Sequence, residues 1–311
     1  MKFSIDPWDP GYGSSDSGEL DVSSAEINLE LERPMAEWGP VAPTSVGDDP
    51  EVVWFCDGVR RVEARVWIDD DPNVFAGICA SYAAGIVRCD RTSSRVVDID
   101  VQRGLFTASP TAAPIDTVHG SFAVHMATSS APDMLSLRLQ DQMTITEITV
   151  ANNALGADDE GLLVIDGPLR GRQNLRSAVG LIKTHHTDYL PTELLPVLRS
   201  LAHGERTPVF TIGGMWTRHS WYLRLPGPGG SPRAGIVRCE CSSDLNAESA
   251  VAMANVSARV LPRYASEAHK DTRAPQNLYP IAGLERELRH RLGDPALMYR
   301  ALRRAAGPLA R

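Results

Sequence analysis

The sequence predicts an α/β fold of the mixed α+β kind, with a mixed central β-sheet flanked by helices. Two observations support this: apolar runs of strand length fill residues 51–107, and beyond residue 135 such runs alternate with stretches of helical periodicity. Strands first, followed by alternating strands and helices, are typical of a domain with a mixed sheet. With 311 residues, 43% of them hydrophobic, the chain is long enough to bury a full core.

The first strands are predicted by apolar runs and by alternation. Residues 52–56 form an apolar run that ends at Asp57-Gly58, and Asp-Gly is a common turn dipeptide. Residues 59–68 then alternate apolar and charged side chains. We therefore expect a β-hairpin that turns at Gly58 and buries one face. Two further runs are interpreted as strands: residues 74–87 and 95–107.

A helix is predicted over residues 135–155, because apolar residues recur there at four-residue steps and so share one face. The remaining apolar runs predict strands ending at Asp166 and covering residues 178–183, 208–213, 221–225 and 235–241. Helical periodicity predicts helices near residues 192–202, 248–263, 281–292 and 295–306.

Charge is distributed unevenly along the chain. Residues 1–50 hold eleven acids and two bases, whereas the other 261 residues hold 28 acids and 29 bases. Residues 1–48 are also rich in Gly, Ser and Pro, which predicts an acidic N-terminal arm with one edge strand at residues 26–32. The folded domain is expected over residues 49–311. Its C-terminal helices are basic, which suits phosphate contact and equally suits a solvated helix face.

Composition also bounds the compartment. The five cysteines lie mostly in strand-like runs, so we expect reduced, buried thiols. Cys239 and Cys241 have no second Cys or His pair at the spacing of a zinc site. No apolar stretch approaches the roughly 20 residues of a membrane span, and no signal-peptide pattern is present. A cytoplasmic protein with no membrane contact is expected.

Three acids are candidates for a functional site. Asp57 and Asp166 each close an apolar run, and a carboxylate at the end of a buried strand can stay ionised and face a ligand. Two such carboxylates brought together repel unless a cation lies between them, and Mg²⁺ or Mn²⁺ favours oxygen ligands. Glu147 lies in the apolar row of the predicted helix, where a charge needs compensation. The alternatives are a structural turn at Asp57 and a buried Glu–Arg pair at Glu147.

The order Asp57, Glu147, Asp166 resembles that of the NurA nuclease family. The resemblance spans roughly residues 51–292, through segments 54–58, Arg138 with Glu147, 163–169, 180–184, 221–225 and 277–280. It implies an RNase H-like core, Mn²⁺- or Mg²⁺-dependent cleavage of DNA, and a homodimer that acts with a HerA-type hexameric ATPase in DNA end processing or defence. Carried over by position, the three acids would be metal ligands, Lys183 would face the scissile phosphate, and Tyr279 would lie near it.

Two positions depart from the family pattern. The family places a His shortly after the Tyr-Pro step, where this chain has Glu285-Arg286-Glu287. Glu287 takes that role, or His290 does from about one helical turn further on, or the site is partly degenerate. The Ser usual after the first Asp-Gly step is Val59 here, which removes a hydroxyl and keeps the carboxylate.

Other functions compete with DNA cleavage. A catalytically degenerate adaptor would bind DNA or the ATPase ring without cutting, and the missing His favours it. A phosphohydrolase of small nucleotides has less support, because the chain has no glycine-rich phosphate loop. His185 and His186 are adjacent and are expected at the rim rather than on a metal. The acidic arm is hypothesised to mimic nucleic acid and cover the cleft, so that deleting residues 2–45 raises DNA affinity.

Overall fold

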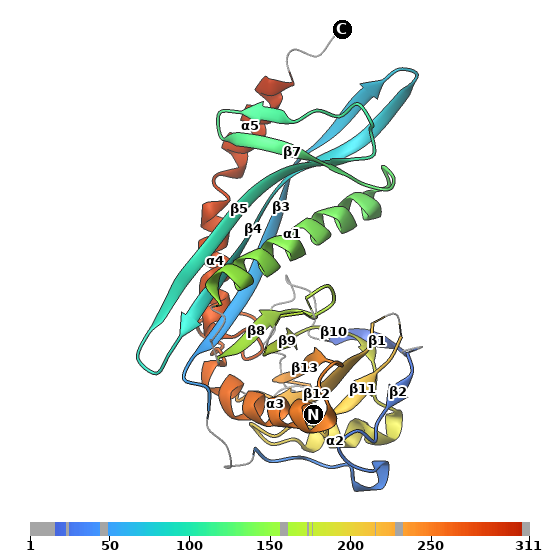
Figure 1. Cartoon of the computed structure of the whole chain (residues 1–311), viewed down its shortest axis with the longest axis vertical. Coiled ribbons are helices and arrows are strands. Elements are labelled where there is room, and N and C mark those ends of the chain that lie inside the picture. The colour runs from blue at the N-terminus through green and yellow to red at the C-terminus, as the bar shows by residue number, and fades with distance from the viewer. Residues whose placement is uncertain are drawn as a thin grey trace, which may run out of the picture. The chain divides into compact units, whose positions relative to one another are not determined.

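The chain is described by a computed structural model over residues 16–22, 25–43, 49–155, 161–172, 174–175, 177–214, 216–227 and 233–306 (Figure 1). It is an α+β protein with a mixed sheet flanked by helices, as the sequence predicts. Two compact units divide it: unit 1 is Met1–Phe55, Arg88–Arg95 and Asp158–Ala282, and unit 2 is Cys56–Val87, Val96–Ala157 and Gly283–Arg311. None of the described helices is long and apolar enough to cross a membrane.

Unit 1 is built on a sheet of order β2-β11-β12-β13-β9-β8, with the first residues of β3 beside β8. Its strands are β2 (Ile27–Asn28), β8 (Leu162–Asp166), β9 (Ala178–Ile182), β11 (Phe210–Ile212), β12 (Arg218–Arg224), β13 (Ile236–Ser242) and the start of β3 (Val53–Asp70). β8 and β9 are parallel, and the pairs from β9 to β2 are antiparallel. A separate parallel pair joins β1 (Asp16–Val22) to β10 (His185–Asp188).

Helices cover this sheet. α3 (Ala247–Val260) contacts β12 and β13 through small residues, among them Ala250 and Ala254. Trp221 reaches across from β12 and donates from Nε1 to Oγ of Ser257 over 3.0 Å. A hydrophobic cluster packs η3 (Thr192–Leu194) and α2 (Leu195–Ser200) against strands β11, β12 and β13. Its buried members are Leu190, Leu194, Leu198, Leu201, Phe210, Ile212, Tyr222 and Ile236.

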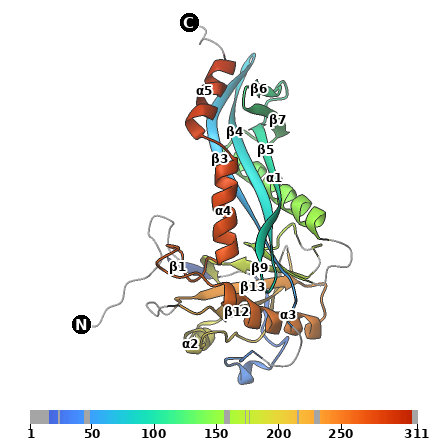
Figure 2. The same cartoon turned by 90° about the vertical axis from the view of Figure 1, so that its left-hand side faces the viewer.

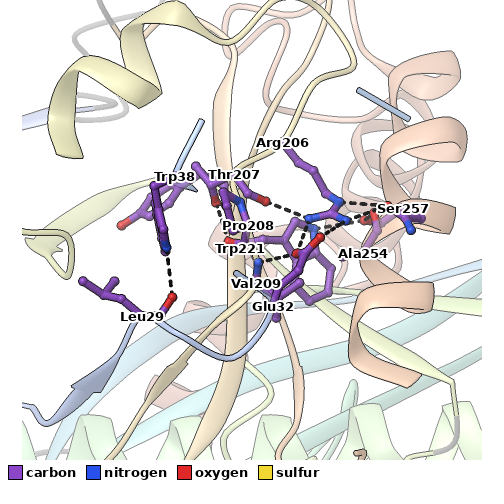
Figure 3. Close-up of polar contacts among 12 residues, drawn as sticks. Leu29, Glu32, Trp38, Arg206, Thr207, Pro208, Val209, Trp221, Ala254 and Ser257 are labelled. Atoms are coloured by element: carbon purple, nitrogen blue, oxygen red, sulfur yellow. Dashed lines mark hydrogen bonds and ion pairs between the residues drawn. The ribbon is translucent and has the colours of Figure 1, made fainter. Parts of the chain in front are cut away.

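The segment before residue 43 is tied to unit 1 by a buried ion pair (Figure 3). The carboxylate of Glu32 accepts from the Arg206 guanidinium at 2.7 and 2.9 Å and from the Val209 amide at 2.7 Å. Asn255 Oδ1 also accepts from Arg206, over 2.6 Å. Trp38 packs beside Phe210. The short helix η2 (Met35–Glu37) belongs to the same described stretch, residues 25–43.

Unit 2 is a sheet of order β3-β4-β5-β7-β6 with three helices. Its further elements are β4 (Asn73–Cys89), β5 (Ser94–Thr107), β6 (Ile115–Thr117), β7 (Gly120–Met126), α1 (Pro132–Ala154), α4 (Tyr279–Arg291) and α5 (Pro295–Ala305). Short connections join β3 to β4 and β4 to β5, as antiparallel neighbours allow. β5 and β7 run parallel, and β6 and β7 antiparallel.

In Figure 2 the sheet of unit 2 lies between α1 on one side and α4 and α5 on the other, and alternate residues of β4 serve its two faces. Ile78, Ala80 and Tyr82 pack with α1, in a cluster that includes Leu135, Leu139 and Met143. Cys79 packs on the opposite side with Met298 and Leu302 of α5. A side chain at Gly85 would meet Leu284 and Leu288 of α4 at 2.9 and 3.1 Å. The sheet of unit 2 is thus covered by α1 on one face and by α4 and α5 on the other.

Several sequence predictions are corrected. The hairpin predicted at Gly58 is wrong, because β3 continues without a turn and reverses only at residues 71–72 before β4. Gly58 serves close packing instead. The edge strand expected at residues 26–32 is limited to β2. β1, β6, β7 and β10 were not predicted, whereas the helix over residues 135–155 and the five free, buried cysteines are confirmed.

Candidate functional site

Asp57 lies near the start of β3 and is buried, with 6% of its surface exposed. Within unit 2, one of its carboxylate oxygens lies within 4.8 Å of a carboxylate oxygen of Glu285, on α4. Leu284, the neighbour of Glu285, packs against Gly85 and so fixes this turn of α4 on the sheet. Two carboxylates this close suit a divalent cation that both would ligate.

Glu147 reaches the same stretch of β3 from α1 and is 2% exposed. A Cβ on Gly58 would lie 2.5 Å from Oε1 of Glu147 and 3.0 Å from Cγ of Met143. Only glycine leaves room for that approach. Cys56 donates from Sγ to the Glu147 carbonyl over 3.7 Å. The structure therefore brings Glu147 to the residue that follows Asp57, and the predicted apolar row of α1 is the buried face that carries it there.

Asp166 ends β8 in unit 1, as predicted, and is followed by a turn at Gly167. Gly167 has φ +102°, a conformation that L side chains rarely adopt, and its amide donates to the Leu181 carbonyl over 2.9 Å. Lys183 donates from Nζ to Oδ2 of Asp166 over 2.6 Å and to Oδ1 of Asn277 over 2.9 Å. Asn277 in turn donates to Asp271 over 2.7 Å. The predicted pair of Asp166 and Lys183 is thus in direct contact.

Tyr279 begins α4, and its surroundings differ from those of Lys183. Lys270 donates from Nζ to the Tyr279 hydroxyl over 3.3 Å, and its ammonium lies 5.1 Å from the ring centroid. Hydrogen bonds to Tyr279 and to Glu267 raise the pKa of Lys270, so it stays charged beside the phenol. A cation held against Tyr279 makes this end of α4 attractive to an anionic group.

Neither of the two residues predicted to replace the family His, Glu287 and His290, is buried. Glu287 pairs with Arg291 one turn along α4, over 2.7 Å, and His290 is exposed. Glu285 is the acid of that run that approaches Asp57. Sequence reasoning noted the run but did not select Glu285. The one sequence feature that could have pointed to Glu285 is its position directly after Leu284 on a predicted helix.

A pocket of about 410 Å³ adjoins Asp166 within unit 1. Lys183, His185, Tyr189 and Arg238 are among its lining residues. Burial lowers the pKa of His185 to about 4, so the ring is neutral at pH 7 and donates from Nε2 to the Ile236 carbonyl over 3.1 Å. His185 therefore adds no positive charge to the pocket at that pH.

Comparisons with known proteins find similar structures but no family. No family model matches the sequence, and no curated protein matches it. The structure is similar to that of the NurA nuclease from Sulfolobus solfataricus, with a TM-score of 0.47, 11% identity, and coverage of 82% of this chain and 84% of that one. The catalytic domain of human endonuclease V has a TM-score of 0.34 and 15% identity, and the match covers 89% of this chain and 91% of that one. Ciona intestinalis endonuclease V, in complex with an inosine-containing DNA, has a TM-score of 0.32 and 10% identity, and the match covers 88% of this chain and 92% of that one.

Proposed function

We propose that this chain is a metal-dependent DNA nuclease in which Asp57, Glu147, Asp166 and Glu285 supply the carboxylates. The single observation that carries the proposal is the approach of the Asp57 and Glu285 carboxylate oxygens to within 4.8 Å in unit 2. An all-oxygen donor set fits Mg²⁺ or Mn²⁺. The order of Asp57, Glu147 and Asp166 along the chain, which resembles that of the NurA family, gives the reaction class.

Asp166 is added to the carboxylate group because of its place in the sequence. It ends β8 and is the third acid in the order Asp57, Glu147, Asp166, which resembles that of the NurA family. We therefore infer that Asp166 joins the carboxylates that would hold the cation.

The mechanism assigns each side chain a task. Bound divalent cations would activate a water and stabilise the leaving 3′-oxygen. The carboxylates of Asp57, Glu147, Asp166 and Glu285 hold the cations. Lys183, already fixed against Asp166, neutralises charge on the non-bridging phosphate oxygens. Tyr279, with Lys270 against its ring, hydrogen-bonds the phosphate or stacks on a base.

Cleavage of end-labelled linear DNA, single- and double-stranded, with Mn²⁺ tests the proposal. We expect wild type to cut and Asp57→Asn to lose activity by at least about 100-fold. Asp141→Asn is the matched control, because Asp141 is an exposed acid of α1, and it should cut like wild type. Absence of cleavage in all three, with DNA binding retained, would favour the degenerate adaptor.

The family resemblance also suggests partners, and we propose a homodimer that acts with a HerA-type hexameric ATPase. The ATPase would move DNA toward the nuclease site, since this chain has no phosphate-binding loop of its own. Adding such an ATPase with ATP should raise the cleavage rate, whereas the ATPase without ATP should not. Equal rates in both reactions would remove the partner from the proposal. Light scattering of the nuclease alone tests the dimer.

A further inference from the structure

The Arg238 guanidinium and the Tyr189 ring line the pocket beside Asp166, and Arg218, which is not among the lining residues, contacts the same ring. The Arg238 guanidinium lies 4.9 Å from the centroid of the Tyr189 ring, and that of Arg218 lies 5.4 Å from it. Arg218 also donates to the Tyr189 hydroxyl over 3.2 Å. These contacts restrict both guanidiniums without neutralising them, because a ring holds a cation through its quadrupole.

The charges of this group do not balance. Both guanidiniums contact one buried carboxylate, that of Glu240, at 2.8 Å from Arg238 and 3.2 Å from Arg218. Glu240 is also fixed by the Leu169 amide, which donates to Oε1 over 2.7 Å. Two cations facing one anion leave a net positive charge. Arg238 lines the pocket and Arg218 does not, so the guanidinium that an entering anion would meet is that of Arg238.

A strand of the chain pairs with β10 beside the pocket. β1 pairs in parallel with β10, with Asp16 opposite His185 and Asp21 opposite Thr187. His185 and Thr187 both line the pocket. The backbone of β10 thus pairs with an extended chain next to the pocket.

We propose that this pocket is a subsite for single-stranded DNA, in which Arg238 binds a phosphate of the strand and Tyr189 positions the Arg238 guanidinium. The inference rests on the proposed function, since the strand it holds is the substrate of the site at Asp166. A phosphate of an extended polyanion is the ligand that the Arg238 guanidinium in this pocket selects. A guanidinium matches the geometry of phosphate oxygens better than an ammonium does.

Binding of a short fluorescent oligo-dT, measured by anisotropy in EDTA so that no strand is cut, tests this subsite. Arg238→Gln should weaken binding about tenfold at low salt and lower the slope of log K against log salt by about 0.7, the loss of one phosphate contact. Tyr189→Leu removes the ring that positions Arg238 and should weaken binding, while the Arg238–Glu240 pair stays in place. Tyr189→Phe keeps a ring there, so its binding should return to the wild-type level. Arg199→Gln, an exposed arginine of α2 in the same unit, is the matched control and should bind like wild type.

Asp57→Asn separates this inference from the proposed function. It should bind oligo-dT like wild type, even though we expect it not to cleave. Wild-type affinity and salt slope in a folded Arg238→Gln, checked by circular dichroism, would overturn the subsite whatever the cleavage assays show. If Arg238→Gln does not fold, unchanged affinity in Tyr189→Leu overturns it instead. Loss of cleavage in all variants with these binding effects intact would overturn only the nuclease proposal.

Discussion

Lys183 and Asp166 form a short ion pair, with Nζ 2.6 Å from Oδ2 and side chains that are only 10% and 12% exposed. Lys183 comes directly after β9 and Asp166 ends β8, and these two strands are parallel neighbours. Parallel strands deliver their carboxyl ends to one edge of the sheet, which explains why residues 17 positions apart meet there. Asn277 holds the same ammonium from a third segment.

Lys183→Gln should reduce cleavage about 100-fold without weakening Mn²⁺ binding. The ammonium stabilises charge on the phosphate in the transition state, but before substrate arrives it competes with a cation for Asp166. Cleavage rates and Mn²⁺ titration calorimetry together check this. Arg199→Gln is the control: Arg199 is an exposed cation of α2 outside the proposed site, so we expect a change below about threefold. Weaker Mn²⁺ binding with an unchanged rate in Lys183→Gln would contradict the assigned role.

Gly58→Ala should displace Glu147 and destabilise unit 2. The new Cβ would lie 2.5 Å from Oε1 of Glu147, so the carboxylate or the strand must shift, at about 1–3 kcal/mol. Urea unfolding measures the cost, and cleavage should fall with it. Gly283→Ala makes the same change on α4 with nothing within 4 Å, and it should raise stability by about 0.5–1 kcal/mol. Equal effects of the two substitutions would exclude the steric explanation.

Gly58 also shows what could not be predicted from the local sequence. Asp57-Gly58 predicts a turn from local chemistry, yet the apolar runs on both sides join into β3. The reason for glycine lies on α1, in the carboxylate of Glu147, and no local pattern contains it. Many secondary-structure elements could be predicted from periodicity. Five of them lie close to their predicted ranges: α1, β8, β9, β12 and β13.

Glu285 and Glu32 were missed for the same physical reason. Each gains its role from a partner far along the chain, Asp57 for Glu285 and Arg206 for Glu32. The acidic composition of residues 1–48 predicts an arm, and composition does not record that one of those acids, Glu32, pairs with a buried arginine. The positions of Asp166 and Lys183 at the ends of strands could be predicted locally, whereas their roles stay predictions.

Glu32→Gln should lower the free energy of unfolding by about 3 kcal/mol. Arg206 is almost fully buried, and the neutral amide leaves its guanidinium without a charged partner from Glu32. Thermal or urea unfolding measures the loss. Glu30→Gln, two residues earlier and exposed, should change stability by less than about 0.5 kcal/mol. Equal stability of the two variants would show that the buried pair contributes nothing.

Deleting residues 2–22 should raise affinity for single-stranded DNA several-fold at low salt. The deletion removes β1, a segment of acidic sequence that pairs with β10, and the gain should disappear at high salt because salt screens the repulsion between these acids and DNA. The longer deletion of residues 2–45 is unsuitable, since it also removes Glu32. Replacing Asp16, Glu19 and Asp21 by their amides keeps the chain length and should reproduce the gain. Unchanged affinity in both variants would reject this repulsion.

His185 should make stability depend on pH between about 6.5 and 4. Burial lowers its pKa in the folded protein to about 4, from 6.5 when unfolded, so in that range the unfolded chain binds more protons. The free energy of unfolding therefore falls as the solution is acidified, by about 3 kcal/mol from this residue once pH passes below 4. Urea unfolding at pH 7 and at pH 4.5, in wild type and His185→Gln, isolates the effect. The fall should be smaller in the variant, and an equal fall in both would place the pH dependence on other groups.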